Sequence, residues 1–346
     1  MRASVLPLAL VLAGCSGDVE RIQDTDSGDT GLPVCGRVRG TTGVLLYQDG
    51  GDTIRSPVDA ADTSKVTTGI AGPLDDAGLA WVTVTDGRVY ASEDAGCNWD
   101  AVGTLPASGD WALLAAGTRV YAFDRLSAEG AWSDDLGAGW TAFSTGEAFV
   151  GLPAVDPADT SRLRGVQARG VVTSFDAGSS WSVGGTLPTT PTAAAVSTSD
   201  LDRLAVGSGG GAWTSLNGGA SWSQDWTLGA VGSVALHPDD GTLFLVGVGA
   251  DANLAVWRAD GERLGDVTQV EFPSDLPLYP LPGSPGVVLA GHGPVPNGDG
   301  DPSLALYRFT VGEGVHTVRI ATFAHMNQLA FGPDRWAAAV DGVMAR

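Results

Sequence analysis

Short apolar runs alternate with polar or glycine-containing turns along most of the chain. Residues 79–92 (LAWVTVTDGRVYAS) and 163–174 (LRGVQARGVVTS) each give two β-rich runs around a tight turn, the pattern of a hairpin. A further run precedes each hairpin, as in 110–117 (DWALLAAG), and another follows it, as in 140–144 (WTAFS). No segment keeps the period of an amphipathic helix, so the pattern predicts an all-β fold. Four short strands in about 40 residues is the content of a β-propeller blade.

One octamer recurs in the turns between these runs, each copy 41 residues after the last. It reads SEDAGCNW at 92–99, SDDLGAGW at 133–140, SFDAGSSW at 174–181 and SLNGGASW at 215–222. Serine and aspartate side chains bond to backbone groups in tight turns, and glycine adopts backbone conformations closed to other residues. We expect the closing tryptophan to bury its ring between neighbouring strands. The shared positions are Ser92, Asp94, Gly96 and Trp99; Ser133, Asp135, Gly137 and Trp140; Ser174, Asp176, Gly178 and Trp181; and Ser215, Asn217, Gly219 and Trp222.

This octamer resembles the Asp-box of the bacterial neuraminidase repeat families, whose pattern is Ser-x-Asp-x-Gly-x-x-Trp. Three copies match the pattern in full, and the fourth has Asn217 in place of the aspartate. These families include sialidases, xyloglucan hydrolases, sortilin-type receptors and photosystem II assembly factors. The resemblance implies a β-propeller in which each octamer joins the third and fourth strands of a blade, away from the ligand face. The octamers therefore indicate a fold and not an activity.

Weaker copies of the octamer extend the array towards both ends of the chain. Six complete units and one blade shared between the termini predict a seven-bladed β-propeller, within a domain spanning residues 35–346. The C-terminal stretch 326–346 predicts three strands, which one N-terminal strand would complete. Six and eight blades stay open as alternatives, because 58–65 closely copies 155–162 at a different offset from its octamer. The weaker copies are Tyr47-x-Asp49-x-Gly51-x-x-Ile54, Arg258-x-Asp260-x-Glu262-x-x-Leu264 and Arg308-x-Thr310-x-Gly312-x-x-Val315.

The N-terminus has the pattern of an export signal. Its apolar run is far shorter than the ~20 residues that a membrane-spanning helix needs. Leu12-Ala13-Gly14-Cys15 resembles the lipobox of bacterial lipoproteins, which implies diacylation of Cys15, and Ser16 implies sorting to the outer membrane. An ordinary signal peptide with a chance cysteine is the alternative. We expect a signal peptide at 1–14, an acidic flexible tether at 15–34, and a propeller on the periplasmic side or the cell surface.

Charge and cysteine content narrow the choice of partners. The 19 Lys and Arg residues against 40 Asp and Glu residues give a formal charge of -21. This balance argues against nucleic-acid binding, which needs cations to neutralise phosphates, and against electrostatic binding to anionic lipid. A monomer is expected. With Cys15 acylated, Cys35 and Cys97 are left in an oxidising compartment, and this even pair predicts a disulfide.

Binding residues are expected on the face opposite the octamers, where the other loops lie. Most of those loops are short, but 124–130, 247–253 and 291–303 are longer. The last of them contains Asn297, Asp299 and Asp301, whose alternating oxygen ligands suit Ca²⁺. A solvated polar loop is the alternative, and no other cofactor is expected. Trp226 and Phe272 are candidates for exposed aromatic residues that bind a partner.

Catalytic residues are not identified by the sequence. Arg55, in Ile54-Arg55-Ser56-Pro57, resembles the first arginine segment of sialidases, but no Tyr-Glu pair accompanies it. Glycosidases need two carboxylates at a set separation, and the predicted first strands are nearly free of acids. The leading hypothesis is a non-catalytic binding or scaffolding lipoprotein that recognises a protein or glycan. A glycoside hydrolase of sialidase or xyloglucanase type, and an assembly factor similar to the photosystem II family, are the alternatives.

Overall fold

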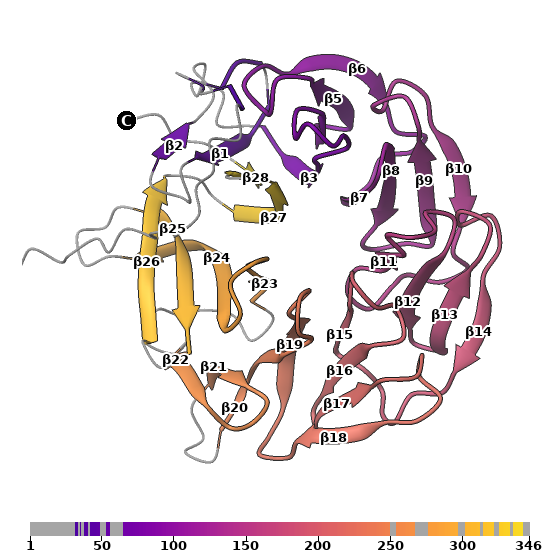
Figure 1. Cartoon of the computed structure of the whole chain (residues 1–346), viewed down its shortest axis with the longest axis vertical. Coiled ribbons are helices and arrows are strands. Elements are labelled where there is room, and N and C mark those ends of the chain that lie inside the picture. The colour runs from indigo at the N-terminus through magenta and orange to yellow at the C-terminus, as the bar shows by residue number, and fades with distance from the viewer. Residues whose placement is uncertain are drawn as a thin grey trace, which may run out of the picture.

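In the computed structural model the chain folds into a closed ring of four-stranded antiparallel sheets (Figure 1). The structure describes residues 32–33, 35, 38–40, 42–48, 53–55, 65–249, 254–266, 276–296, 302–311, 314–321, 325–332 and 335–341. These residues form strands and no helix, so the all-β prediction is confirmed and the described part holds no helix able to span a membrane.

Seven sheets surround one axis, so the protein is a seven-bladed β-propeller, as predicted (Figure 1). From the axis outwards, blade 1 is β27 (His325–Gly332), β28 (Arg335–Asp341), β1 (Val44–Gln48) and β2 (Thr53–Arg55); blade 2 is β3 (Thr67–Ala71), β4 (Trp81–Thr85), β5 (Arg88–Ser92) and β6 (Asp100–Thr104); blade 3 is β7 (Trp111–Ala116), β8 (Arg119–Asp124), β9 (Glu129–Ser133) and β10 (Thr141–Ser144); blade 4 is β11 (Ala154–Val155), β12 (Leu163–Gln167), β13 (Gly170–Ser174) and β14 (Ser182–Gly185); blade 5 is β15 (Ala193–Val196), β16 (Leu204–Ser208), β17 (Gly211–Ser215) and β18 (Ser223–Trp226); blade 6 is β19 (Val231–Leu236), β20 (Leu243–Val248), β21 (Leu254–Arg258) and β22 (Arg263–Asp266); and blade 7 is β23 (Leu278–Pro280), β24 (Val287–Pro296), β25 (Pro302–Thr310) and β26 (Gly314–Ala321).

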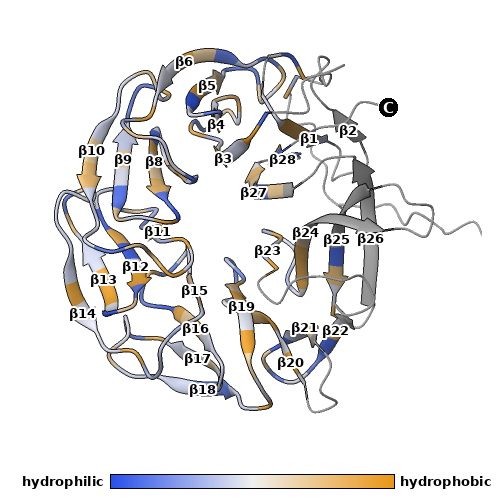
Figure 2. Cartoon of the chain, turned by 180° about the vertical axis from the view of Figure 1, so that it is seen from behind, coloured by the Kyte–Doolittle hydropathy of each residue, from blue (hydrophilic) through white to orange (hydrophobic). Residues whose placement is uncertain are grey.

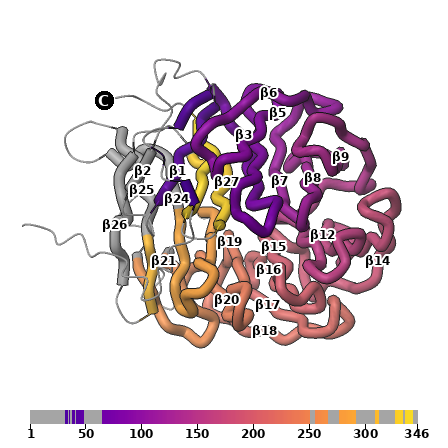
Figure 3. The backbone as a smooth tube through the Cα atoms, turned by 45° about the horizontal axis from the view of Figure 1, so that its top comes forward, coloured from indigo at the N-terminus to yellow at the C-terminus, as the bar shows by residue number. Residues whose placement is uncertain are grey.

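Blade 1 closes the ring with strands from both ends of the chain. β28 pairs with β1 in antiparallel register, Val44 opposite Ala339 and Gln48 opposite Arg335, and Figure 3 shows β1 beside β27. The predicted division into three C-terminal strands and one N-terminal strand is wrong, because each end supplies two. The weak octamer at 47–54 lies between β1 and β2, so both strands flanking it belong to one blade as its third and fourth.

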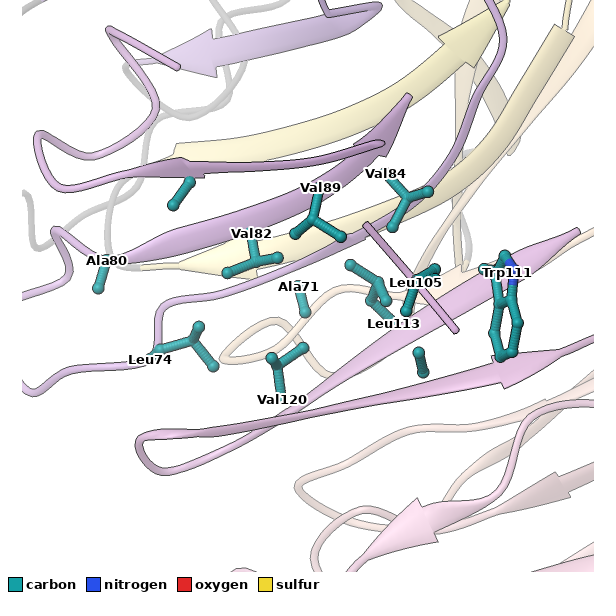
Figure 4. Packing of buried hydrophobic residues seen from close by; sticks show 12 residues of the cluster. Ala71, Leu74, Ala80, Val82, Val84, Val89, Leu105, Trp111, Leu113 and Val120 are labelled. Atoms are coloured by element: carbon teal, nitrogen blue, oxygen red, sulfur yellow. The ribbon is translucent and has the colours of Figure 1, made fainter. Parts of the chain in front are cut away.

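The hydrophobic core lies between neighbouring blades. Val82, Val84 and Val89 of blade 2 pack against Leu113 and Val120 of blade 3 in one buried cluster (Figure 4). The second strands β4, β12 and β16 are buried along their whole length, whereas the outermost strands β6, β10 and β14 are largely exposed. The hydrophobic stretches accordingly follow the strands of each blade (Figure 2). Each blade therefore buries both faces of its sheet against its two neighbours.

The four strong octamers fold into the same hydrogen-bonded turn. In blade 3 the Ser133 hydroxyl donates to Asp135 (2.6 Å) and accepts from the Gly137 N–H (2.9 Å), and Asp135 accepts from the Gly139 N–H (2.9 Å). Gly137 has φ of 85°, in the left-handed region that favours glycine. The corresponding serine bonds recur at Ser92, Ser174 and Ser215, where Asn217 replaces the aspartate.

All four octamers join the third and fourth strands of their blades, so they lie on one face of the ring, here called the octamer face. The closing tryptophans are less uniform than the sequence predicts. Trp99 is buried at 3% exposure, but Trp140, Trp181 and Trp222 are only half-buried. Their rings lie where an outer, partly exposed strand begins, so one side of each ring stays open to solvent.

Acid should weaken the octamer turns. Hydrogen bonds from the Ser133 hydroxyl and the Gly139 N–H hold the pKa of Asp135 below its ordinary value, and bonds from Ser180 do the same for the pKa of Asp176. Because these pKa values are lower in the folded state, the stabilisation is present above the unfolded value of about 4. It is lost as pH falls through the folded pKa values. We expect the urea midpoint to fall steeply between about pH 4 and pH 2.

The matched control for this pH dependence is Asp135→Asn, which keeps the acceptor oxygen as Asn217 does in blade 5 but cannot titrate. Its urea midpoint should change less with pH over the same window. An unchanged pH slope in the variant would mean that Asp135 does not contribute.

Candidate functional site

One buried glutamine joins the inner strands of blades 1, 2 and 3 near the ring axis. The side-chain amide of Gln328 donates to the Leu113 carbonyl (2.6 Å) and accepts from the N–H groups of Leu113 (3.0 Å) and Ile70 (3.3 Å). Gln328 is 5% exposed, so these bonds lie away from solvent, where an unpaired polar group is costly. The three blades are thereby fixed relative to one another.

Arg125 connects the same three blades on the face opposite the octamers, here called the octamer-free face. It follows β8, and its guanidinium lies 2.6 Å from the Asp110 carboxylate. It also donates to the carbonyls of Thr68 and Asn327, both at 3.1 Å. Charge-assisted bonds of this kind are stronger than neutral ones. Arg125 is therefore held in one orientation while part of its side chain, 24%, remains exposed.

The inner strands around Arg125 carry further polar groups. Burial raises the pKa of Tyr279 in blade 7 to about 12, although the charge of Arg125 acts in the opposite direction. The phenol therefore stays protonated at neutral pH and can act as a hydrogen-bond donor but not as a base. The Asn327 side chain donates to Asp341 (2.8 Å), which also accepts from the Thr67 N–H (3.1 Å).

An exposed leucine lies directly beside Arg125. Leu126 is 80% exposed, and Val66 on the same face is 43% exposed. The loop that carries Leu126 is held in place by Asp124, whose carboxylate accepts from the Leu126 N–H (3.1 Å) and the Ser127 hydroxyl (2.7 Å). The octamer-free face therefore presents an apolar side chain on a fixed loop next to a fixed guanidinium.

The inner strands lack the groups that glycoside hydrolysis needs. No aspartate or glutamate occurs in β3, β7, β11, β15, β19, β23 or β27. On the octamer face a shallow cavity of about 390 Å³ opens between blades 2 and 3, and its acidic lining includes Glu93, Asp94, Asp100 and Asp135. In the part of the chain that the structure describes, no group of three or more His, Cys, Asp or Glu residues could hold a metal ion.

The structure tests some of the residues predicted from the sequence. Trp226 is not an exposed binding residue: it is the last residue of β18, 2% exposed, with its ring 5.1 Å from that of Trp257. Arg55 ends β2, the outermost strand of blade 1, so it lies on the rim of the ring and not on the inner strands. Cys35 and Cys97 form the expected disulfide, with Cα atoms 5.4 Å apart. Other candidates lie outside the described residues: Cys15, Phe272, Asn297, Asp299 and Asp301.

Sequence reasoning missed Gln328 and the role of Arg125. The only signal for Arg125 is its place in the longer loop at 124–130. Its carbonyl partners are 57 and 202 residues away in the chain, so no local pattern identifies them. Gln328 gives no signal beyond being a polar residue in an apolar strand.

Replacing Gln328 with alanine should lower the free energy of unfolding by about 2–4 kcal/mol. The change leaves three buried backbone groups of Leu113 and Ile70 without partners, each costing about 1–3 kcal/mol before relaxation. Gln224→Ala is the control, because Gln224 is exposed on β18 and such surface changes stay within about 0.5 kcal/mol. Urea unfolding of the two variants measures the difference, and equal midpoints would contradict the prediction.

Comparison with known proteins supports the fold. No known protein family matches the sequence, and no curated protein matches it either. A GH74 enzyme of Niastella koreensis is similar in structure, with a TM-score of 0.52 and 18% identity over 72% of this chain and 36% of that chain. YCF48 bound to D1 peptide gives a TM-score of 0.54 and 13% identity over 90% of this chain and 99% of that chain. YCF48 from Cyanidioschyzon merolae gives a TM-score of 0.51 and 14% identity, over 86% and 97%.

The chain thus spans about a third of the GH74 enzyme but nearly all of YCF48. At these identities the similarities show that the chain has the β-propeller fold of both groups. They do not distinguish the enzymes from the non-enzymatic propellers, because one fold hosts many functions.

Proposed function

We propose that this protein is a lipid-anchored, non-catalytic binding propeller whose octamer-free face binds a protein partner. The observation that carries the proposal is the pairing of Leu126, 80% exposed, with the fixed guanidinium of Arg125. Apolar side chains and arginines that need little ordering are effective anchors at protein interfaces. Val66 extends the apolar surface on the same face.

The comparisons add support at the level of the fold. YCF48, which has been solved with a bound peptide, covers the whole ring of blades, whereas the GH74 similarity covers less than half of that enzyme. A related ring size and a peptide ligand in one such propeller make a protein partner the better choice over a glycan. An assembly role, as a form of protein binding, belongs to the same proposal.

The proposed location rests on the sequence of the N-terminus. Leu12-Ala13-Gly14-Cys15 resembles a lipobox, so Cys15 would carry the lipid and the propeller would lie outside the cytoplasm. The disulfide between Cys35 and Cys97 suits an oxidising compartment. Mass spectrometry of the mature N-terminus tests this part directly, and an unacylated terminus at another residue would contradict it.

Glycan hydrolysis is the second candidate, favoured by the similarity to GH74 enzymes. The inner strands carry no carboxylate pair, and Arg55 lies on the rim. An enzyme would therefore need acids from loops of the octamer-free face. Release of sugar from a glycan panel by the purified protein would favour this candidate over binding alone.

Photo-crosslinking in cells tests the binding proposal. A photoreactive residue in place of Leu126 should give a discrete protein adduct, whereas the same residue in place of Leu216 on the octamer face should not. With the crosslinked protein identified, Leu126→Asp should weaken its binding by about tenfold or more, and Leu216→Asp should leave it unchanged. Equal effects of the two substitutions would overturn the assignment of the binding face.

A further inference from the structure

The N-terminal segment joins the propeller on the octamer face. Cys35 is linked to Cys97 of the first octamer by the disulfide. The backbone of Arg39 pairs with the same octamer, through bonds to Cys97 (2.8 Å) and Trp99 (2.9 Å). Arg335, at the start of β28, donates to the Pro33 carbonyl (3.1 Å) and to the Ala95 carbonyl (2.7 Å). Any chain preceding Pro33 therefore leaves the ring at this face.

The described C-terminal end lies on the other face. β28 ends at Asp341, which bonds the Thr67 N–H and the Asn327 side chain on the octamer-free face. The two ends of the chain thus leave the propeller on opposite sides. An anchor at the N-terminus would consequently draw the octamer face, and not the binding face, towards the membrane.

The octamer face also carries two exposed apolar side chains across the ring from this exit. Phe175, in the octamer of blade 4, is 65% exposed, and Leu216, at the same octamer position in blade 5, is 71% exposed. The corresponding residues near the exit are polar: Glu93 in blade 2 and Asp134 in blade 3, the latter bound to Arg119. Nothing within the described fold covers either apolar side chain.

We propose that the octamer face is the membrane-proximal surface, and that Phe175 and Leu216 contact the lipid bilayer. The inference rests on the proposed lipid anchor at Cys15. The tether exit in blade 2 and the apolar side chains in blades 4 and 5 lie on opposite sides of one ring face. Two attachments placed in this way set the plane of that face parallel to the membrane, and they present Arg125 and Leu126 away from it.

The length of the tether supports this orientation. Residues 16–31 separate Cys15 from the described chain. A flexible chain of 16 residues has a root-mean-square span of about 20–24 Å, and it reaches about 53–58 Å only when fully extended. Turning the octamer-free face to the membrane would require the tether to pass over the rim of the ring in an almost extended state. The octamer face is accessible at the ordinary span.

The charge of the octamer face decides which kind of lipid fits. Asp94, Asp135 and Asp176 have lowered pKa values and are ionised at neutral pH. Strongly anionic lipid would repel this face, so contact through Phe175 and Leu216 is expected on zwitterionic lipid, where only the apolar term acts.

Crosslinking to lipid in vesicles of stated composition tests the orientation. The full-length acylated protein is reconstituted in phosphatidylcholine vesicles with a photoreactive phenylalanine derivative at Phe175, Leu216 or, as the matched exposed control, Leu126. Lipid adducts should form several-fold more at Phe175 and Leu216 than at Leu126. The Cys15→Ala protein, added to the same vesicles, should form few adducts at any of the three positions.

Each result separates the inference from the proposals on which it rests. Equal lipid adducts at Leu126 and Leu216, or more at Leu126, would overturn the orientation while leaving the anchor intact. Protein adducts at Leu216 in cells, with none to lipid in vesicles, would identify the apolar pair as a protein-binding surface and also overturn it. Mass spectrometry that finds no acyl chain at Cys15 would remove the anchor, and the inference with it.

Discussion

Replacing Trp99 with alanine should lower the free energy of unfolding by about 3–5 kcal/mol, the usual cost of truncating a buried tryptophan. Trp99 is 3% exposed and packs in a cluster with Leu46 of blade 1, Trp81 of blade 2 and the disulfide cysteines. Its indole N–H donates to the Gly96 carbonyl at 3.0 Å. The ring thus stabilises an octamer turn and the junction where the two ends of the chain meet.

Trp181→Ala is the matched control for Trp99→Ala. Trp181 closes the equivalent octamer of blade 4 and donates to the Gly178 carbonyl at 3.0 Å, but it is only half-buried. Because roughly half of the apolar area is lost, its truncation should cost about 1–3 kcal/mol. Urea unfolding followed by circular dichroism compares the two variants. A Trp181 variant as unstable as the Trp99 variant would show that burial does not decide the cost.

The turns and blades were predictable because their determinants lie within a few residues of one another. In each octamer the serine, the aspartate or asparagine and the glycine bond across at most four residues. A local pattern of this kind can be read directly from the sequence. The fixed repeat then predicts the number of blades, since every copy marks the same turn.

Trp226 shows where such local reading fails. The run WSQDW predicts a short strand ending in a loop, and the structure places Trp226 at the end of β18 opposite Ala212. The register of β17 against β18 shifts between Ala212 and Trp213. A one-residue shift exchanges the faces of a strand, and Trp226 therefore points inwards to Trp257. A bulge of this kind has no signature in the sequence.

The candidate site was predictable only as a face and not as a set of residues. The octamers identify which face carries the remaining loops, and the structure places Leu126 on that face. Arg125, however, gains its orientation from Asp110, Thr68 and Asn327, which lie in three different blades. Such contacts exist only once the ring has closed.

Removal of the disulfide, by the double substitution Cys35→Ala and Cys97→Ala, should cost about 4 kcal/mol of the free energy of unfolding. The two cysteines are 62 residues apart, and the loss of chain entropy in the unfolded state for a loop of this length corresponds to about 4 kcal/mol at 25 °C. The bond also holds the N-terminal segment on blade 2 while β1 completes blade 1. Its loss therefore acts at the junction on which ring closure depends.

The measurement compares urea unfolding of the natural protein and the double variant, each with and without a thiol reductant. Reductant should shift the midpoint of the natural protein towards that of the variant and leave the variant unchanged, because the variant has no bond between these positions to reduce. Since Trp99 contacts both cysteines in one cluster, adding Trp99→Ala to the double variant should cost less than the sum of the separate changes. Equal midpoints for the oxidised natural protein and the double variant would mean that the contacts of Arg39 and Arg335 alone hold the N-terminal segment on the octamer face.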